Sequence, residues 1–186
     1  MQKKVLKNDT LNLKQRVRFD KFGLLVFAVL FGLIGFYVLY RSEALPSSRT
    51  PSVLTSPGFI VNPTSKNLKR GEVLTVTVYV NSFSEPINAV QANILYSADK
   101  LQFVSINSST SPFEVQAQST GGNGVVKIAR GHVGSLSGQQ EVSKITFTAL
   151  AKGSTQVTFT DGSAVVRSTD NKDILSQTIG GKYNIR

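Results

Sequence analysis

The sequence of 186 residues predicts an all-β protein, an antiparallel two-sheet sandwich of the jelly-roll or immunoglobulin-like kind, preceded by one transmembrane helix. Three observations predict this class. One apolar run near the N-terminus carries no charge, strict alternation of apolar and polar residues dominates the rest, and turn-forming residues separate the alternating segments. About nine short strands in a segment of one-domain size are typical of such a sandwich.

The apolar run extends from Phe22 to Tyr40. A helix of this length covers about 28 Å, close to the hydrocarbon thickness of a bilayer. The preceding segment, Met1–Lys21, contains seven Lys or Arg residues against two Asp residues. Because positive charge beside a span stays inside, we expect a single-pass membrane protein with a cytoplasmic N-terminus and an extracellular C-terminal domain. A cleaved signal peptide is the alternative, with a weak cleavage site at Ser42–Ala44.

A spacer follows the predicted span, because Arg41–Gly58 holds five Ser and three Pro residues. The chain is therefore divided into a basic head at 1–21, a signal-anchor helix at 22–40, a linker at 41–58 and one β-domain at 59–186. The sequence contains no cysteine. An exported domain without disulfides has to be held together by its hydrophobic core.

Strict alternation predicts four strands whose apolar residues face the core. Their core residues are Leu74, Val76, Val78 and Val80, then Val90, Ala92, Ile94 and Tyr96, then Ile145, Phe147 and Ala149, and finally Val157 and Phe159. Shorter strands are predicted at Phe59–Val61, Leu101–Ile106, Phe113–Gln118, Val125–Arg130, Ala164–Val166 and Lys182–Ile185. Turn signals lie at Asn67–Gly71, Ser97–Lys100, Gly121–Gly124, Gly153, Asp161–Gly162 and Gly180–Gly181.

The composition argues against catalysis. With no cysteine and a single histidine, Cys–His chemistry and His-rich zinc sites are excluded, and a Ser–His–acid triad would need His132, which we expect in a Gly-rich loop. The acidic residues are scattered at turns and show no pair for glycoside hydrolysis. The net charge is +10, but no basic cluster with interleaved aromatics follows the span, so a nucleic-acid partner is not expected. We expect no enzyme and no cofactor.

Several segments, taken in order, resemble the cohesin domain: Gly71–Asn81, Ile87–Ile106, Gly121–Gly131, Gly134–Phe159 and Gly180–Ile185. The resemblance implies a nine-stranded jelly roll and a binding module. Cohesins hold calcium-loaded dockerin modules, classically on polysaccharide-degrading enzymes, and their structural relatives include carbohydrate-binding modules. The family's Tyr-Asp-Pro is here Tyr96-Ser97-Ala98, and the Asn and Asp with which some cohesins contact the partner correspond to Ala89 and Gln91.

The candidate binding site is a sheet face. Alternation directs Ala89, Gln91, Asn93 and Leu95 outward, and we expect Lys127 and Arg130 on a neighbouring outward face. Such a set could form a flat protein-binding surface with a polar rim. Asp170 and Asp173 are weak metal candidates, because the Lys172 between them suits an ordinary polar turn better than a calcium loop. Any calcium is expected on the partner.

These observations predict a non-catalytic binding module at the bacterial cell surface, anchored in the membrane by Phe22–Tyr40. Its expected partner is a dockerin-like protein or another surface or secreted protein. The alternative is a carbohydrate-binding or adhesive sandwich that holds polysaccharide. Only Tyr79 is a mid-strand aromatic directed away from the core, and Trp is absent. A fibre subunit is a third possibility, but three prolines in the linker stop the helix soon after the membrane.

Overall fold

The computed structural model describes residues 53–186. The predicted basic head, the predicted span Phe22–Tyr40 and most of the predicted linker therefore lie outside the described residues. Within residues 53–186 all of the regular secondary structure is β-strand. In this part of the chain no helix has the length and apolarity needed to cross a bilayer.

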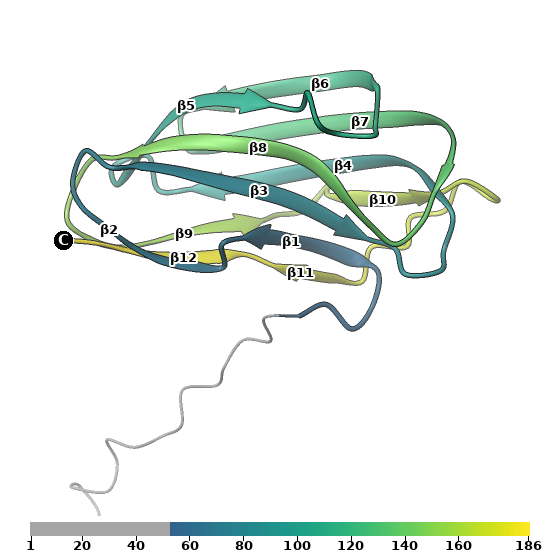
Figure 1. Ribbon diagram of the computed structural model, residues 1–186, viewed down its shortest axis with the longest axis horizontal. Coiled ribbons are helices and arrows are strands. Elements are labelled where there is room, and N and C mark those ends of the chain that lie inside the picture. Colours follow the sequence, from purple (N-terminus) through teal and green to yellow (C-terminus); the bar gives the residue numbers. More distant parts are fainter. Residues whose placement is uncertain (1–52) are drawn as a thin grey trace, which may run out of the picture. The chain divides into compact units, whose positions relative to one another are not determined.

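Two sheets stack face to face, as Figure 1 shows. The first sheet has five strands in the order β11 (Gln177–Ile179), β1 (Gly58–Asn62), β3 (Val73–Asn81), β8 (Gln139–Ala149) and β5 (Leu101–Asn107). The second has seven strands. Six follow the order β2 (Ser65–Leu68), β12 (Gly181–Ile185), β9 (Gly153–Phe159), β4 (Ile87–Tyr96), β7 (Val125–Leu136) and β6 (Val115–Gly122), and β10 (Ala164–Arg167) pairs with β4.

The predicted sandwich is confirmed, but its strand count and pairing differ from the prediction. Two strands were not predicted, β2 and β11, and part of β2 had been assigned to a turn. The prediction of a purely antiparallel sandwich is also wrong, since β1 pairs with β11 and β2 with β12 in parallel. The segment SKNL of β2 has no alternation of its own, so only pairing with a distant strand makes it extended.

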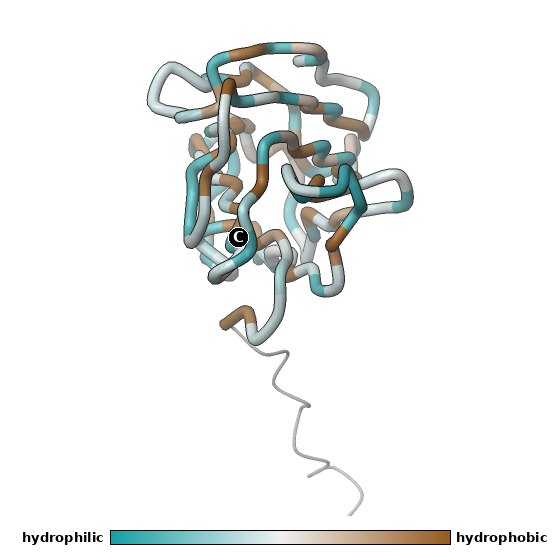
Figure 2. The backbone as a smooth tube through the Cα atoms, turned by 90° about the vertical axis from the view of Figure 1, so that its right-hand side faces the viewer, coloured by the Kyte–Doolittle hydropathy of each residue, from teal (hydrophilic) through white to brown (hydrophobic). Residues whose placement is uncertain are grey.

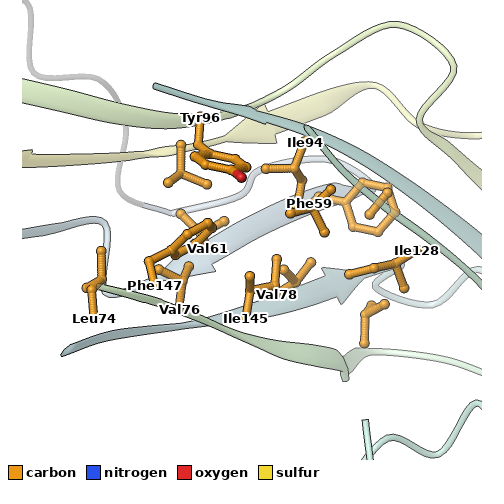
Figure 3. Close-up of a cluster of buried hydrophobic side chains, with 14 of the residues drawn as sticks. Phe59, Val61, Leu74, Val76, Val78, Ile94, Tyr96, Ile128, Ile145 and Phe147 are labelled. Atoms are coloured by element: carbon orange, nitrogen blue, oxygen red, sulfur yellow. The ribbon is translucent and has the colours of Figure 1, made fainter. Parts of the chain in front are cut away.

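The core lies between the two sheets and consists of the residues that alternation assigned to it. All the predicted core residues are buried except Phe159, which is half-buried. Figure 3 shows these side chains pointing toward one another from opposite sheets. Phe59 stacks on Phe159 with ring centroids 5.2 Å apart, and Tyr96 lies 4.9 Å from Phe147. Figure 2 shows the matching alternation of hydrophobic and hydrophilic residues along the backbone.

Strand β4 is central to the second sheet. One edge pairs with β7, and the other edge pairs with β10 in its first half and β9 in its second half. Strand β6 joins the outer edge of β7 through a turn at Asn123–Gly124, where both residues have positive φ, as a two-residue type I′ hairpin requires. The outward side chains of β10, β4, β7 and β6 therefore form one continuous surface, called the β4 face below.

Candidate functional site

The structure places four of the predicted site residues outward on β4. Ala89, Gln91, Asn93 and Leu95 alternate with buried residues along this strand. Lys127 on β7 lies directly opposite Asn93 in the ladder and is exposed, so it shares the same face. Five of the six predicted side chains therefore belong to the β4 face.

The placement of Arg130 on this face is wrong. Arg130 has the same parity as Val126 and Ile128, so it points inward and is only 7% exposed. Its Nε donates to the backbone carbonyl of Phe113 at 2.8 Å, and its Nη1 donates to Gln116 Oε1 at 3.1 Å. Burial lowers the pKa of this guanidinium. The period of two along a strand forbids Lys127 and Arg130 from sharing a face without a bulge between them.

A shallow hollow of about 260 Å³ lies in the first half of the β4 face. Small residues and valines from four neighbouring strands line most of it. The lining includes Ala89, Ala117, Ala129, Gly131, Ala164, Val115 and Val166, together with two polar residues, Gln91 and Arg130. No carboxylate, histidine or hydroxyl group lines this hollow. The Arg130 guanidinium is bonded to Phe113 and Gln116, and the Gln91 amide is bonded to Gly162. The hollow is therefore mainly an apolar contact surface, which suits burial of a partner's apolar side chain.

The polar side chains of the β4 face hold a neighbouring turn. Gln91 Nε2 donates to the Gly162 carbonyl at 2.8 Å, and Asn93 Nδ2 donates to the Asp161 carbonyl at 3.2 Å. These bonds fasten the β9–β10 turn to β4 and position β10 at the margin of the hollow. Gly162 has φ +80°, which favours glycine, and a Cβ there would lie 2.8 Å from Asn93 Nδ2 and would have to displace this amide.

A histidine–carboxylate contact lies beside the hollow, just before β6. His132 Nδ1 is 2.7 Å from Glu114 Oε2, and the Val133 N–H donates to Glu114 Oε1 at 2.9 Å. The Val133 bond, with His132 assisting, lowers the pKa of Glu114 to about 2. His132 was expected in a loop, but it lies within β7, which continues past the predicted end at Arg130. Its ring joins the two strands that border the hollow.

The two weak metal candidates are engaged elsewhere. Asp170 accepts two hydrogen bonds from Arg167, at 3.0 and 2.9 Å, and this contact lowers its pKa to about 2. Asp173 Oδ1 accepts from the backbone N–H groups of Val165 and Leu175. The two carboxylates thus stabilise the β10–β11 loop. Within residues 53–186, no group of three His, Cys, Asp or Glu residues could hold a metal ion.

Sequence reasoning missed most of the hollow. Ala129 and Gly131 follow Lys127 at the outward period of two, so alternation along β7 could have identified them. The residues from β6 and β10 gave no such signal, since their place beside β4 and β7 depends on strand pairing.

A family model for the cohesin domain matches residues 59–185. Solved structures with a similar fold include a cohesin of Clostridium acetobutylicum, 16% identical, with a TM-score of 0.59 over 70% of this chain and 92% of that chain. The third ScaB cohesin of R. flavefaciens, in complex with a group 1 dockerin, is 18% identical, with a TM-score of 0.57 over 72% and 99%. A non-cellulosomal cohesin from Archaeoglobus fulgidus is 15% identical, with a TM-score of 0.57 over 70% and 91%. Among curated proteins, none matches the chain.

Proposed function

Because the chain belongs to the cohesin family, we propose that it is a non-catalytic docking module and that the β4 face binds its partner. The observation that carries this proposal is the apolar hollow of about 260 Å³ on an otherwise ordinary outward sheet face. Exposed apolar surface at one place on a sheet is typical of a protein-binding site. The partner we propose is a dockerin-like module of a surface or secreted protein.

Three features of the β4 face support protein docking. The small residues that line the hollow allow a partner's backbone or apolar side chain to approach the sheet closely. Val115 is 50% exposed and Leu95 is 44% exposed, so both offer apolar area to a partner. Lys127 supplies a charged group outside the hollow, where solvent-exposed polar groups of an interface usually lie. The arrangement is an apolar centre with a polar rim.

The contacts differ in kind from those that the Asn and Asp of some cohesins make. Ala89 offers no hydrogen bond from its side chain, and the amide N–H of Gln91 is already donated to the β9–β10 turn. We infer that shape and apolar burial supply most of the affinity, with the amides fixing the turn. A rigid surface of this kind loses little conformational entropy when it binds.

Membrane anchoring is the second part of the proposal. The charge-free run Phe22–Tyr40, with its basic N-terminal flank, supports an uncleaved anchor that holds the domain outside the cell. Tethering raises the local concentration of bound partners at the surface. Membrane fractionation with external protease tests this part: the domain should be digested on intact cells, and a domain found only in the medium refutes the anchor.

Substitution of Ala129 tests the docking surface. Ala129→Glu places a long charged side chain in the hollow from an outward position, so partner binding should fall by about a hundredfold or more while folding is retained. Thr75→Glu is the matched control, because Thr75 points outward from β3 in the other sheet.

The assay captures secreted and surface proteins of the source organism on the full chain in detergent, with calcium and with a chelator. Calcium-dependent retention of a protein with paired Asp/Asn-rich calcium loops, lost in Ala129→Glu and kept in Thr75→Glu, supports the proposal. Undiminished retention by Ala129→Glu rules out the β4 face as the docking surface.

A further inference from the structure

A second surface lies on the same sheet, on the outer face of β2, β12 and β9. We propose that it binds an acidic polysaccharide, and this proposal is independent of protein docking at the β4 face. The ladder places Asn184 of β12 between Asn67 of β2 and Ser154 of β9. These three side chains form a row across the strands, and Lys182 lies two residues away along β12. Together with the cations described next they are called the β12 array.

A row of three cationic residues lies at one end of the array, beside the end of β12. Arg186 lies opposite Lys69, because its N–H donates to the Leu68 carbonyl and its carbonyl accepts from Arg70 N–H, as in a parallel ladder. On the other side Lys152 directly precedes Gly153, which pairs with Ile185. All three cationic residues are exposed. Like charges opposite each other destabilise a sheet, so an anionic ligand would relieve a cost built into the free protein.

Among residues 53–186, no ion pair involves Lys69, Lys152, Lys182 or Arg186. Lys66 also lies on this surface, but its Nζ forms an ion pair with Glu72 Oε1 at 2.9 Å. Glu72 Oε2 also accepts a hydrogen bond from the backbone N–H of Lys69 at 2.9 Å, so this carboxylate offsets part of the charge at that end of the array. Lys152, Lys182 and Arg186 carry the rest of its positive charge.

The array contains a depression lined by polar side chains, which favours an anion that also carries hydrogen-bonding groups. A depression of about 350 Å³ is lined by amide, hydroxyl and lysine side chains, including Asn67, Asn184, Ser154 and Lys182. Asn184 Nδ2 and Asn67 Oδ1 are 3.4 Å apart, which leaves the remaining amide positions of this pair for a ligand. Tyr183 is buried at 1% exposure, so no aromatic ring is offered here for base stacking.

Amides and hydroxyls beside a row of cations match a chain of sugars that carries both hydroxyl groups and carboxylates. Three strands at about 4.8 Å spacing and five positions along each give an array of about 10 by 13 Å, a suitable size for a few sugar rings. The array begins beyond the end of β4 at Tyr96, whereas the apolar hollow surrounds Gln91. Six positions along the strands, or about 20 Å, separate the level of Lys182 from Gln91, so the two ligands need not compete.

Binding of short galacturonic acid oligomers to the full chain in neutral detergent tests the proposal, with glucose oligomers of equal length and polyphosphate as comparison ligands. The galacturonate should bind in a salt-sensitive manner, and Lys182→Glu should weaken it about tenfold. Asn184→Ala should weaken the galacturonate more than it weakens polyphosphate, because only the sugar uses the amide.

Lys172→Glu is the matched control, since it makes the same charge change in the β10–β11 loop. The proposal fails if galacturonate does not bind, if glucose oligomers or polyphosphate bind equally well, or if Lys172→Glu weakens binding as much as Lys182→Glu. Capture of a protein partner should be the same in Lys182→Glu as in the wild type, so loss at the array and loss at the β4 face can be distinguished.

Discussion

The β9–β10 turn offers a direct test of how the β4 face is kept rigid. Gly162→Ala should destabilise the domain in two ways. The residue has φ +80°, and a left-handed conformation costs an alanine about 1–2 kcal/mol. The new Cβ would also lie 2.8 Å from Asn93 Nδ2 and displace the amide that donates to the Asp161 carbonyl. Loss of this bond adds about 0.5–1.5 kcal/mol.

Gly71→Ala separates these two contributions. Gly71 has φ +82°, almost the same as Gly162, but no atom lies within 4 Å of the Cβ that alanine would add. The backbone strain and the reduced entropy of the unfolded chain should therefore be similar in the two variants. We expect Gly162→Ala to lower the free energy of unfolding by about 0.5–1.5 kcal/mol more than Gly71→Ala does.

Urea unfolding of both variants, with the slope held to the wild-type value, measures this difference. Partner capture should weaken in Gly162→Ala only, because the displaced turn carries β10, which borders the hollow. Equal destabilisation of the two variants, within about 0.3 kcal/mol, would refute the role of Asn93 in holding the turn.

Two further predictions concern residues beside the hollow. Arg130→Ala removes a buried side chain and leaves the Phe113 carbonyl without its donor, so urea unfolding should show a loss of about 2–4 kcal/mol, whereas Lys127→Ala should change stability by less than about 0.5 kcal/mol. Similar losses in both variants would contradict the inward placement of Arg130. Glu114→Gln should remove a pH-dependent contribution: because folding lowers the pKa of Glu114 from 4.5 to about 2, its stabilising effect is complete above pH 4.5 and disappears as the pH falls toward about 2. A wild-type advantage over Glu114→Gln that does not change across this interval would contradict the contact with Val133.

The sequence was sufficient for every feature that depends on local periodicity. Alternation identified the buried residues of β3, β4 and β8, and it directed Ala89, Gln91, Asn93 and Leu95 outward. Alternation succeeded because one face of a half-buried strand contacts the core and the other contacts water. The polarity of each side chain therefore indicates the face to which it points. The same rule, applied to β7, would have predicted that Arg130 points toward the core.

Features that depend on which strands are neighbours were decided only by the tertiary structure. Strand β2 is too short and polar to be recognised, and its parallel partner β12 lies at the far end of the sequence. The apolar hollow needs β6 and β10 beside β7 and β4, and the β12 array needs three strands from distant parts of the chain. The pairing of strands that are far apart in the sequence is determined by packing of the whole core. It cannot be predicted from a local pattern of residues.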